Sequence, residues 1–248
     1  MMMPTAAAHT DTHQSEPMIL SLGRLNGSKV ERFVVIRDVA GEDLENNHDR
    51  PYMRFYQNAS LVLFHFDPTQ IADVRNELRG MTTELNDVGG EPSTVLEHTL
   101  KILGSHRPKL AVALSKFDAL QMIGANAANA GSSAPSSHSG NWVMRLGNPG
   151  AAFNREPADP LSYDEEDGQF LHEEVRSLLI SLKAKGIVNQ LENPAGHPIP
   201  HRFFATSALG EPPMNKQTNP RGIAPFRVLG PVKWALAEAG FIPKGAKK

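Results

Sequence analysis

Residues 109–118 read KLAVALSKFD and place an almost continuous apolar run directly before a polar turn. A short run that is apolar at successive positions is typical of a strand buried on both faces, as in parallel sheets. Residues 61–66, LVLFHF, form a second such run, which ends in Asp67-Pro68. Residues 202–206, RFFAT, form a third and shorter one. These three runs predict the strands of a parallel sheet.

Segments with helical spacing of apolar residues separate and follow these strands. They are residues 70–78, the stretch after the capping box Thr94-x-x-Glu97, residues 170–182 and residues 226–236. Strands that alternate with helices imply a layered α/β fold with helices on both faces of the sheet.

A hairpin is predicted before the first of these strands. Residues 18–25, MILSLGRL, run into Asn26-Gly27, and the apolar run at 30–38 follows. Asn-Gly between two apolar runs favours a tight turn, because both turn positions need positive φ. Residues 1–17 are polar and low in complexity, so they are predicted to be a disordered tail.

Residues 121–165 differ from the rest of the chain in composition. They are rich in Gly, Ala, Ser and Asn, and they are too long for an ordinary connection. We therefore expect one α/β domain over residues 18–243, with a flexible insertion at about 121–165.

Composition excludes several classes of protein. Among 248 residues, 25 Lys and Arg oppose 27 Asp and Glu, so the net charge of -2 predicts neither nucleic-acid nor anionic-membrane binding. The absence of cysteine excludes disulfide scaffolds, Cys-ligated metals and thiol nucleophiles. No export signal or membrane-length apolar run is present in the sequence, so a cytoplasmic location is expected.

Three predicted strands end in polar signatures, and ligands of parallel α/β sheets collect at such ends. After residues 30–38, Asp38 could hold hydrated Mg²⁺, and the Gly41 amide could approach a phosphate. Glu42 follows directly. An ordinary acidic turn would read the same way.

The other two signatures follow the strands at 109–114 and 202–206. The Asp118 carboxylate could accept two N–H groups of a base edge, with the Lys116 stem against the base or ribose. At Ser207-Ala208, a small residue leaves a backbone N–H for a carbonyl. The alternatives are a helix cap at Asp118 and a plain turn at Ser207.

In this order, VVIRDVAGE, LAVALSKFD and FFATSAL resemble the motifs of Ras-like GTPases, and the bacterial double-GTPase group in particular. The resemblance implies a P-loop GTPase-like fold, a three-layer sandwich with a mostly parallel sheet, that binds GTP or GDP with Mg²⁺. It also assigns roles to site residues. These are Mg²⁺ binding by Asp38, phosphate contact by Gly41, water positioning by Glu42, guanine selection by Lys116 and Asp118, and assistance from Ser207 and Ala208.

The sequence departs from that family upstream of the hairpin, because nothing matches the phosphate-binding G-x-x-x-x-G-K-[ST]. Two explanations stay open: an N-terminally incomplete domain, or one that has lost phosphate binding. In either case we expect weak or no GTP hydrolysis. The alternative is a nucleotide-independent scaffold that binds a protein partner on a GTPase-like fold, with the stretch 121–165 as a binding surface. A half-site completed by another chain is a third interpretation.

Two further clusters are interpreted as structural. His197 and His201 have a ligand-like spacing, but the prolines between them prevent a helix, so a surface loop is expected. The acidic run Asp164–Asp167 lacks the alternating ligands of a Ca²⁺ loop, and it is expected to begin a helix.

Overall fold

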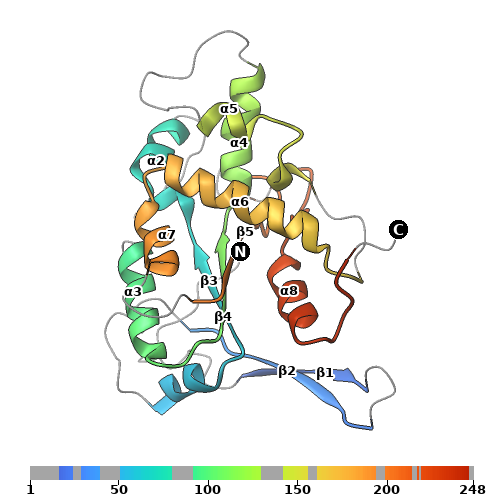
Figure 1. The fold of residues 1–248 in the computed structure, drawn as a ribbon. Coiled ribbons are helices and arrows are strands. Elements are labelled where there is room, and N and C mark those ends of the chain that lie inside the picture. The colour runs from blue at the N-terminus through green and yellow to red at the C-terminus, as the bar shows by residue number, and fades with distance from the viewer. Residues whose placement is uncertain are drawn as a thin grey trace.

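The computed structural model describes residues 17–24, 29–39, 51–79, 92–129, 142–155, 161–193, 199–213, 217 and 219–245. Its centre is a three-stranded parallel sheet in the order β3-β4-β5 (Figure 1). The strands are β3 (Leu61–Phe66), β4 (Lys109–Leu114) and β5 (His201–Ala205). All three strands predicted from the apolar runs are confirmed, and the chain is a mixed α/β protein.

The strands of the sheet differ in how far they are buried. From Leu110 to Leu114 the central strand β4 is fully buried. In β3 only alternate residues are buried, and Leu63 and His65 between them are exposed. The prediction of burial on both faces therefore holds for β4 and fails for β3, which is buried on one face only.

Helices surround this sheet (Figure 1). The α-helices are α2 (Ala72–Leu78), α3 (Pro92–Leu103), α4 (Phe117–Asn129), α5 (Trp142–Leu146), α6 (Glu165–Ser181), α7 (Lys185–Glu192) and α8 (Gly230–Glu238). The 3-10 helices are η1 (Pro51–Asn58), η2 (Pro68–Gln70) and η3 (Ala152–Asn154). Four of the α-helices were predicted, although α8 begins later than expected, at Gly230-Pro231. Proline suits a first turn, where its missing N–H is not needed.

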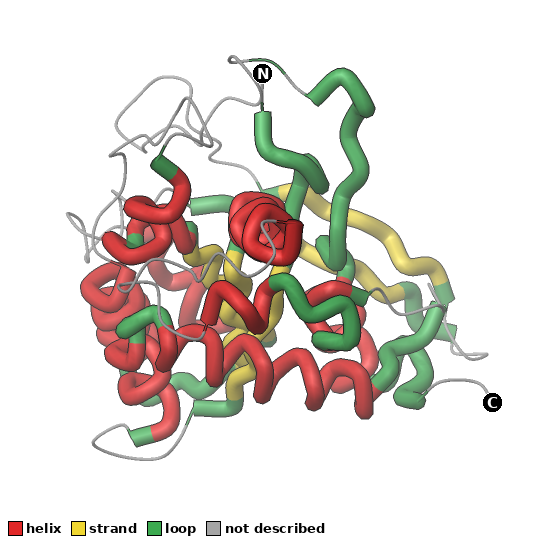
Figure 2. The backbone as a smooth tube through the Cα atoms, turned by 90° about the horizontal axis from the view of Figure 1, so that it is seen from above, coloured by secondary structure: helices red, strands yellow, loops and turns green. Residues whose placement is uncertain are grey.

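The predicted N-terminal hairpin is confirmed as a separate two-stranded sheet. Its strands β1 (Met18–Gly23) and β2 (Arg32–Ile36) pair antiparallel, with Met18 opposite Ile36. In Figure 1 the hairpin lies below α8, and in Figure 2 strands extend away from the helical part of the chain. The expected turn at Asn26-Gly27 and the predicted tail, apart from Pro17, lie outside the described residues.

Parts of the predicted insertion at 121–165 belong to the core. Trp142 and Phe153 are fully buried. Gly124 of α4 lies so close to the end of α5 that a Cβ there would be 2.5 Å from the Leu146 carbonyl carbon. Composition concealed this packing, because small residues permit close helix contact as readily as they form loops. Among the described helices, none is long and apolar enough to cross a membrane.

Candidate functional site

Two of the residues selected from the sequence form one buried contact where β4 and β5 end. Asp118 Oδ1 accepts a hydrogen bond from Ser207 Oγ at 2.5 Å, and both residues are buried. Ser207 Oγ also accepts the Gly210 amide at 2.7 Å, and the Ser207 backbone pairs with Phe226. These bonds fix the chain that leaves β5, so Asp118 and Ser207 have a structural role in this geometry.

The neighbouring selected residues lie at the surface. Lys116 has the unusual φ of 48° and forms an ion pair with Asp67, Nζ to Oδ2 at 2.6 Å. Ala208 is exposed next to the Asp118–Ser207 contact. Lys116 and Asp118, which follow β4, therefore lie at the same edge of the sheet as Ser207 and Ala208, which follow β5, and their proposed roles toward a nucleotide stay untested.

The residues selected after the hairpin are described only in part. Asp38 is exposed beyond the end of β2. Gly41 and Glu42 lie outside the described residues. Within the described part of the chain, no group of three or more His, Asp or Glu side chains is arranged to hold a metal ion.

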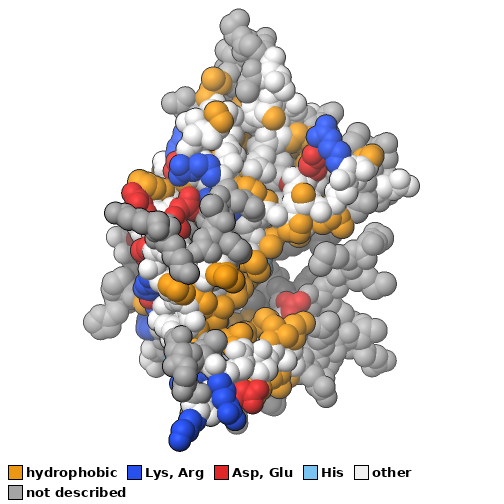
Figure 3. Space-filling view, turned by 90° about the vertical axis from the view of Figure 1, so that its right-hand side faces the viewer, with side chains coloured by type: hydrophobic (Ala, Val, Ile, Leu, Met, Phe, Trp, Pro, Cys, Tyr) orange, Lys and Arg blue, Asp and Glu red, His pale blue; other side chains and the backbone are white. Residues whose placement is uncertain are grey.

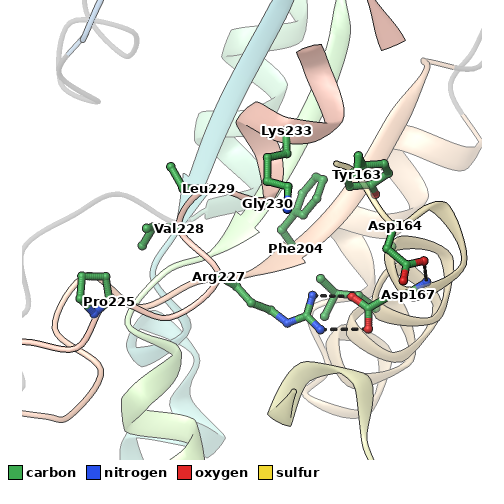
Figure 4. A pocket seen from close by; sticks show the side chains of 12 residues that line it. Tyr163, Asp164, Asp167, Phe204, Pro225, Arg227, Val228, Leu229, Gly230 and Lys233 are labelled. Atoms are coloured by element: carbon green, nitrogen blue, oxygen red, sulfur yellow. Dashed lines mark hydrogen bonds and ion pairs between the residues drawn. The ribbon is translucent and has the colours of Figure 1, made fainter. Parts of the chain in front are cut away.

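A pocket of about 340 Å³ lies between α6, β5 and α8, and no signature in the sequence pointed to it (Figure 4). Asp167 and Arg227 form a double ion pair in its wall, with Nη1–Oδ2 at 2.8 Å and Nη2–Oδ1 at 3.1 Å. Arg227 Nη2 also donates to the Ala152 carbonyl at 2.8 Å. Because these charges satisfy each other, the pocket offers an incoming group mainly its apolar walls.

The acidic run that begins α6 builds one side of this pocket. As predicted, it starts the helix, and the Asp164 side chain caps it by accepting the Asp167 amide at 3.0 Å. The structure adds a second role that local sequence could not reveal. Glu165 pairs with Arg202 at 2.7 Å, and Asp167 pairs with Arg227. The run therefore links the start of α6 to β5 and to the segment before α8.

The floor and rim of the pocket are apolar. Leu171 and Phe204 are buried below it, while Val228 and Leu229 at its edge are 39% and 60% exposed. Gly168 leaves room for the Tyr163 side chain in the wall, because a Cβ there would lie 2.0 Å from the Tyr163 hydroxyl. Such a shape suits an apolar side chain presented by another protein.

The hairpin provides a second exposed apolar surface. We call it the apolar hairpin, and it comprises Met18, Ile19, Leu20, Phe33, Val35 and Ile36, which are 43% to 62% exposed. Strand alternation and the register place Met18, Leu20 and Ile36 on one face, and Ile19, Phe33 and Val35 on the other. Figure 3 shows hydrophobic side chains gathered on the right-hand side of the molecule as drawn in Figure 1.

A comparison with curated proteins finds a relative in Mycolicibacterium smegmatis, provisionally named ESX-1 scaffolding and assembly protein SaeC. It is 41% identical over 242 residues, which cover 96% of this chain and 59% of the relative. The chain thus spans about three fifths of the length of that relative. No protein-family model matches the chain. No solved structure matches it either.

These findings overturn the assignment to Ras-like GTPases and to the double-GTPase group. The similar protein is named for scaffolding and assembly, and neither a GTPase family nor a GTPase structure matches. The motifs misled because they are short: a polar turn with Gly, Lys or Asp follows strands in many α/β proteins. Binding of GTP, GDP or Mg²⁺ was implied by that resemblance, and it stays an untested prediction.

Proposed function

We propose that this chain is a scaffolding and assembly protein that acts by binding other proteins. The similarity to SaeC, 41% identity over 96% of this chain, carries the proposal. It corresponds to the nucleotide-independent scaffold that the sequence offered as the alternative. The binding surface, however, is not sought in residues 121–165, because the described residues there include buried core positions such as Trp142 and Phe153.

Two features of the structure support a protein-binding role. The apolar hairpin and the rim of the pocket both expose large apolar side chains to water. Exposed apolar patches do not stabilise an isolated protein, and they often mark sites of protein–protein interaction. The pocket also has the anatomy of a binding hot spot, because a partner side chain placed between Leu171, Phe204 and Val228 would be largely desolvated.

The test is a chimera in Mycolicibacterium smegmatis. In a strain that lacks SaeC, this chain replaces the matching segment of SaeC, and the remaining two fifths of that protein are kept. We expect the chimera to restore the ESX-1 assembly, measured by native electrophoresis and by co-purification of its components. Intact SaeC and SaeC without the matching segment are the controls. A chimera that accumulates normally but restores nothing would contradict the proposal.

The same chimera tests the pocket. Leu229→Asp places a charge at the rim, and we expect it to weaken assembly at least tenfold, since a charge facing an apolar partner is desolvated without a counterion. Leu229 is the N-cap of α8, where Asp is a preferred residue, so the fold should tolerate the change. Met144→Asp on α5, at 55% exposure against 60% for Leu229, is the matched control and should have no effect.

A further inference from the structure

The two outer edges of the hairpin differ in charge. Met18–Gly23, the whole of β1, contains no charged residue. In contrast, β2 begins with the exposed Arg32 and is flanked by Glu31, Arg37 and Asp38. Because the exposed Arg24 directly follows β1 as well, the difference lies within the strands: β2 contains Arg32, and β1 contains no charge. Charged side chains protect a strand edge against further pairing, so β1 is the less protected of the two edges.

The backbone of β1 is paired with another strand along one edge only, as far as the structure describes the chain. Among the described residues, β1 pairs with β2 alone, so one row of its N–H and C=O groups has no strand partner there. A two-stranded sheet is marginally stable by itself, and three or more strands are needed for independent stability. The hairpin also exposes apolar side chains on both of its faces. Covering them with a further strand would lower the free energy, because apolar surface is removed from water.

We propose that β1 pairs antiparallel with β1 of a second copy, which joins the two hairpins into a four-stranded sheet and forms a two-fold symmetric dimer. An antiparallel strand is complementary to itself, so each edge satisfies the other in an isologous interface. Uncharged residues then meet across the new pair, and the chain's net charge of -2 gives little repulsion between copies. This goes beyond the proposed function, which requires binding to other proteins but no self-association.

Leu20 is the position at which this pairing is best tested. It lies near the middle of β1 and is 46% exposed. When two β1 strands pair about their centres, the two Leu20 side chains come opposite or nearly opposite each other. Like charges at that distance repel and unlike charges attract. Since the side chain is half exposed, a charged residue should not prevent folding.

The experiment is analytical ultracentrifugation of the purified chain at tens of micromolar, with circular dichroism to verify folding. We expect the native chain to sediment at twice its monomer mass of 27.1 kDa. Leu20→Lys and Leu20→Glu should each be monomeric, and their equal mixture should recover the dimer. The matched control Ile180→Lys, on α6 at 43% exposure, should remain dimeric.

Three results would overturn the dimer: a monomeric native chain, a Leu20→Lys variant that stays dimeric, or a mixture that stays monomeric although both variants are folded. Because the measurement uses this chain alone, it fails or succeeds independently of the ESX-1 assembly test.

Discussion

The central sheet and the hairpin are made of similarly apolar strands, and they differ in what surrounds them. From Leu110 to Leu114 the residues of β4 are shielded completely from water, whereas Ile19 of β1 is 62% exposed and Val35 of β2 is 46% exposed. Helices and two flanking strands cover β4. The hairpin has no comparable cover among the described residues. Apolar sequence therefore forms buried core in one region and exposed surface in the other.

The largest effect is expected from the buried ion pair that anchors α6. Asp167→Ala leaves the Arg227 guanidinium, 5% exposed, without its carboxylate, and we expect a loss of about 3–5 kcal/mol in the free energy of unfolding. The control Glu97→Ala breaks the exposed pair with Lys101, for which a much smaller loss is expected because solvent screens the two charges. Urea unfolding measures both. Equal losses would show that burial does not distinguish these pairs.

Leucine truncation compares the sheet and the hairpin directly. Leu114→Ala in β4 removes a fully buried side chain and leaves a cavity, so we expect a loss of about 2–5 kcal/mol. Leu20→Ala in β1 changes a half-exposed side chain, and we expect a shift within about 0.5 kcal/mol for the monomer. Measuring unfolding at low protein concentration separates this from any loss of dimer. A large loss for Leu20→Ala alone would show that the hairpin belongs to the core.

A smaller effect is expected when the pH is lowered. Burial, and then the nearby His201, lower the pKa of His172 to about 4. Its Nδ1 accepts the Phe203 amide at 3.1 Å, and this bond is lost when Nδ1 is protonated. The unfolded chain binds this proton near pH 6.5, so stability is full above that pH and falls as the pH drops toward 4.

We expect the His172 contribution to be about 1–2 kcal/mol, because solvent screens a partly buried ring. His172→Asn keeps an acceptor near the position of Nδ1 and removes the titrating group. Thermal unfolding at pH 7 and pH 4.5 should therefore show a smaller loss for the variant than for the native chain. An identical loss in both would exclude His172 as a source of the acid sensitivity.

Local sequence was sufficient for many secondary-structure elements and for one feature of the site. Apolar runs predicted β3, β4 and β5, and the acidic run at Asp164 predicted the start of α6. Because Asp118 follows β4 and Ser207 follows β5, the predicted parallel strands also place these two residues at the same edge of the sheet. Their mutual hydrogen bond could not be predicted, because it depends on how two strand ends, separated by 89 positions, approach each other.

The pocket shows most clearly what local reasoning misses. Its residues come from three separate parts of the chain, around Asp167, Phe204 and Arg227, and no local pattern indicates that these parts meet. Arg227 was part of a predicted amphipathic helix, and the structure instead places it before α8 with φ of 49°. Its charge is compensated by Asp167, 60 positions earlier. Patterns of neighbouring residues cannot predict an ion pair between segments so far apart in the sequence.

By itself, the sequence determined the alternation of strands and helices, the N-terminal hairpin and the exclusion of cysteine chemistry, because these follow from residue type and from periodicity along a few neighbouring positions. Only the tertiary structure decided which apolar strands are buried, which carboxylates are paired, and where the surface stays apolar. The physical reason is that burial and pairing depend on which segments meet in space. The comparisons overturned the resemblance of the strand-end motifs to GTPases. Only the tertiary structure could show the contacts of these residues: Asp118 and Ser207 bond to each other, and Lys116 pairs with Asp67.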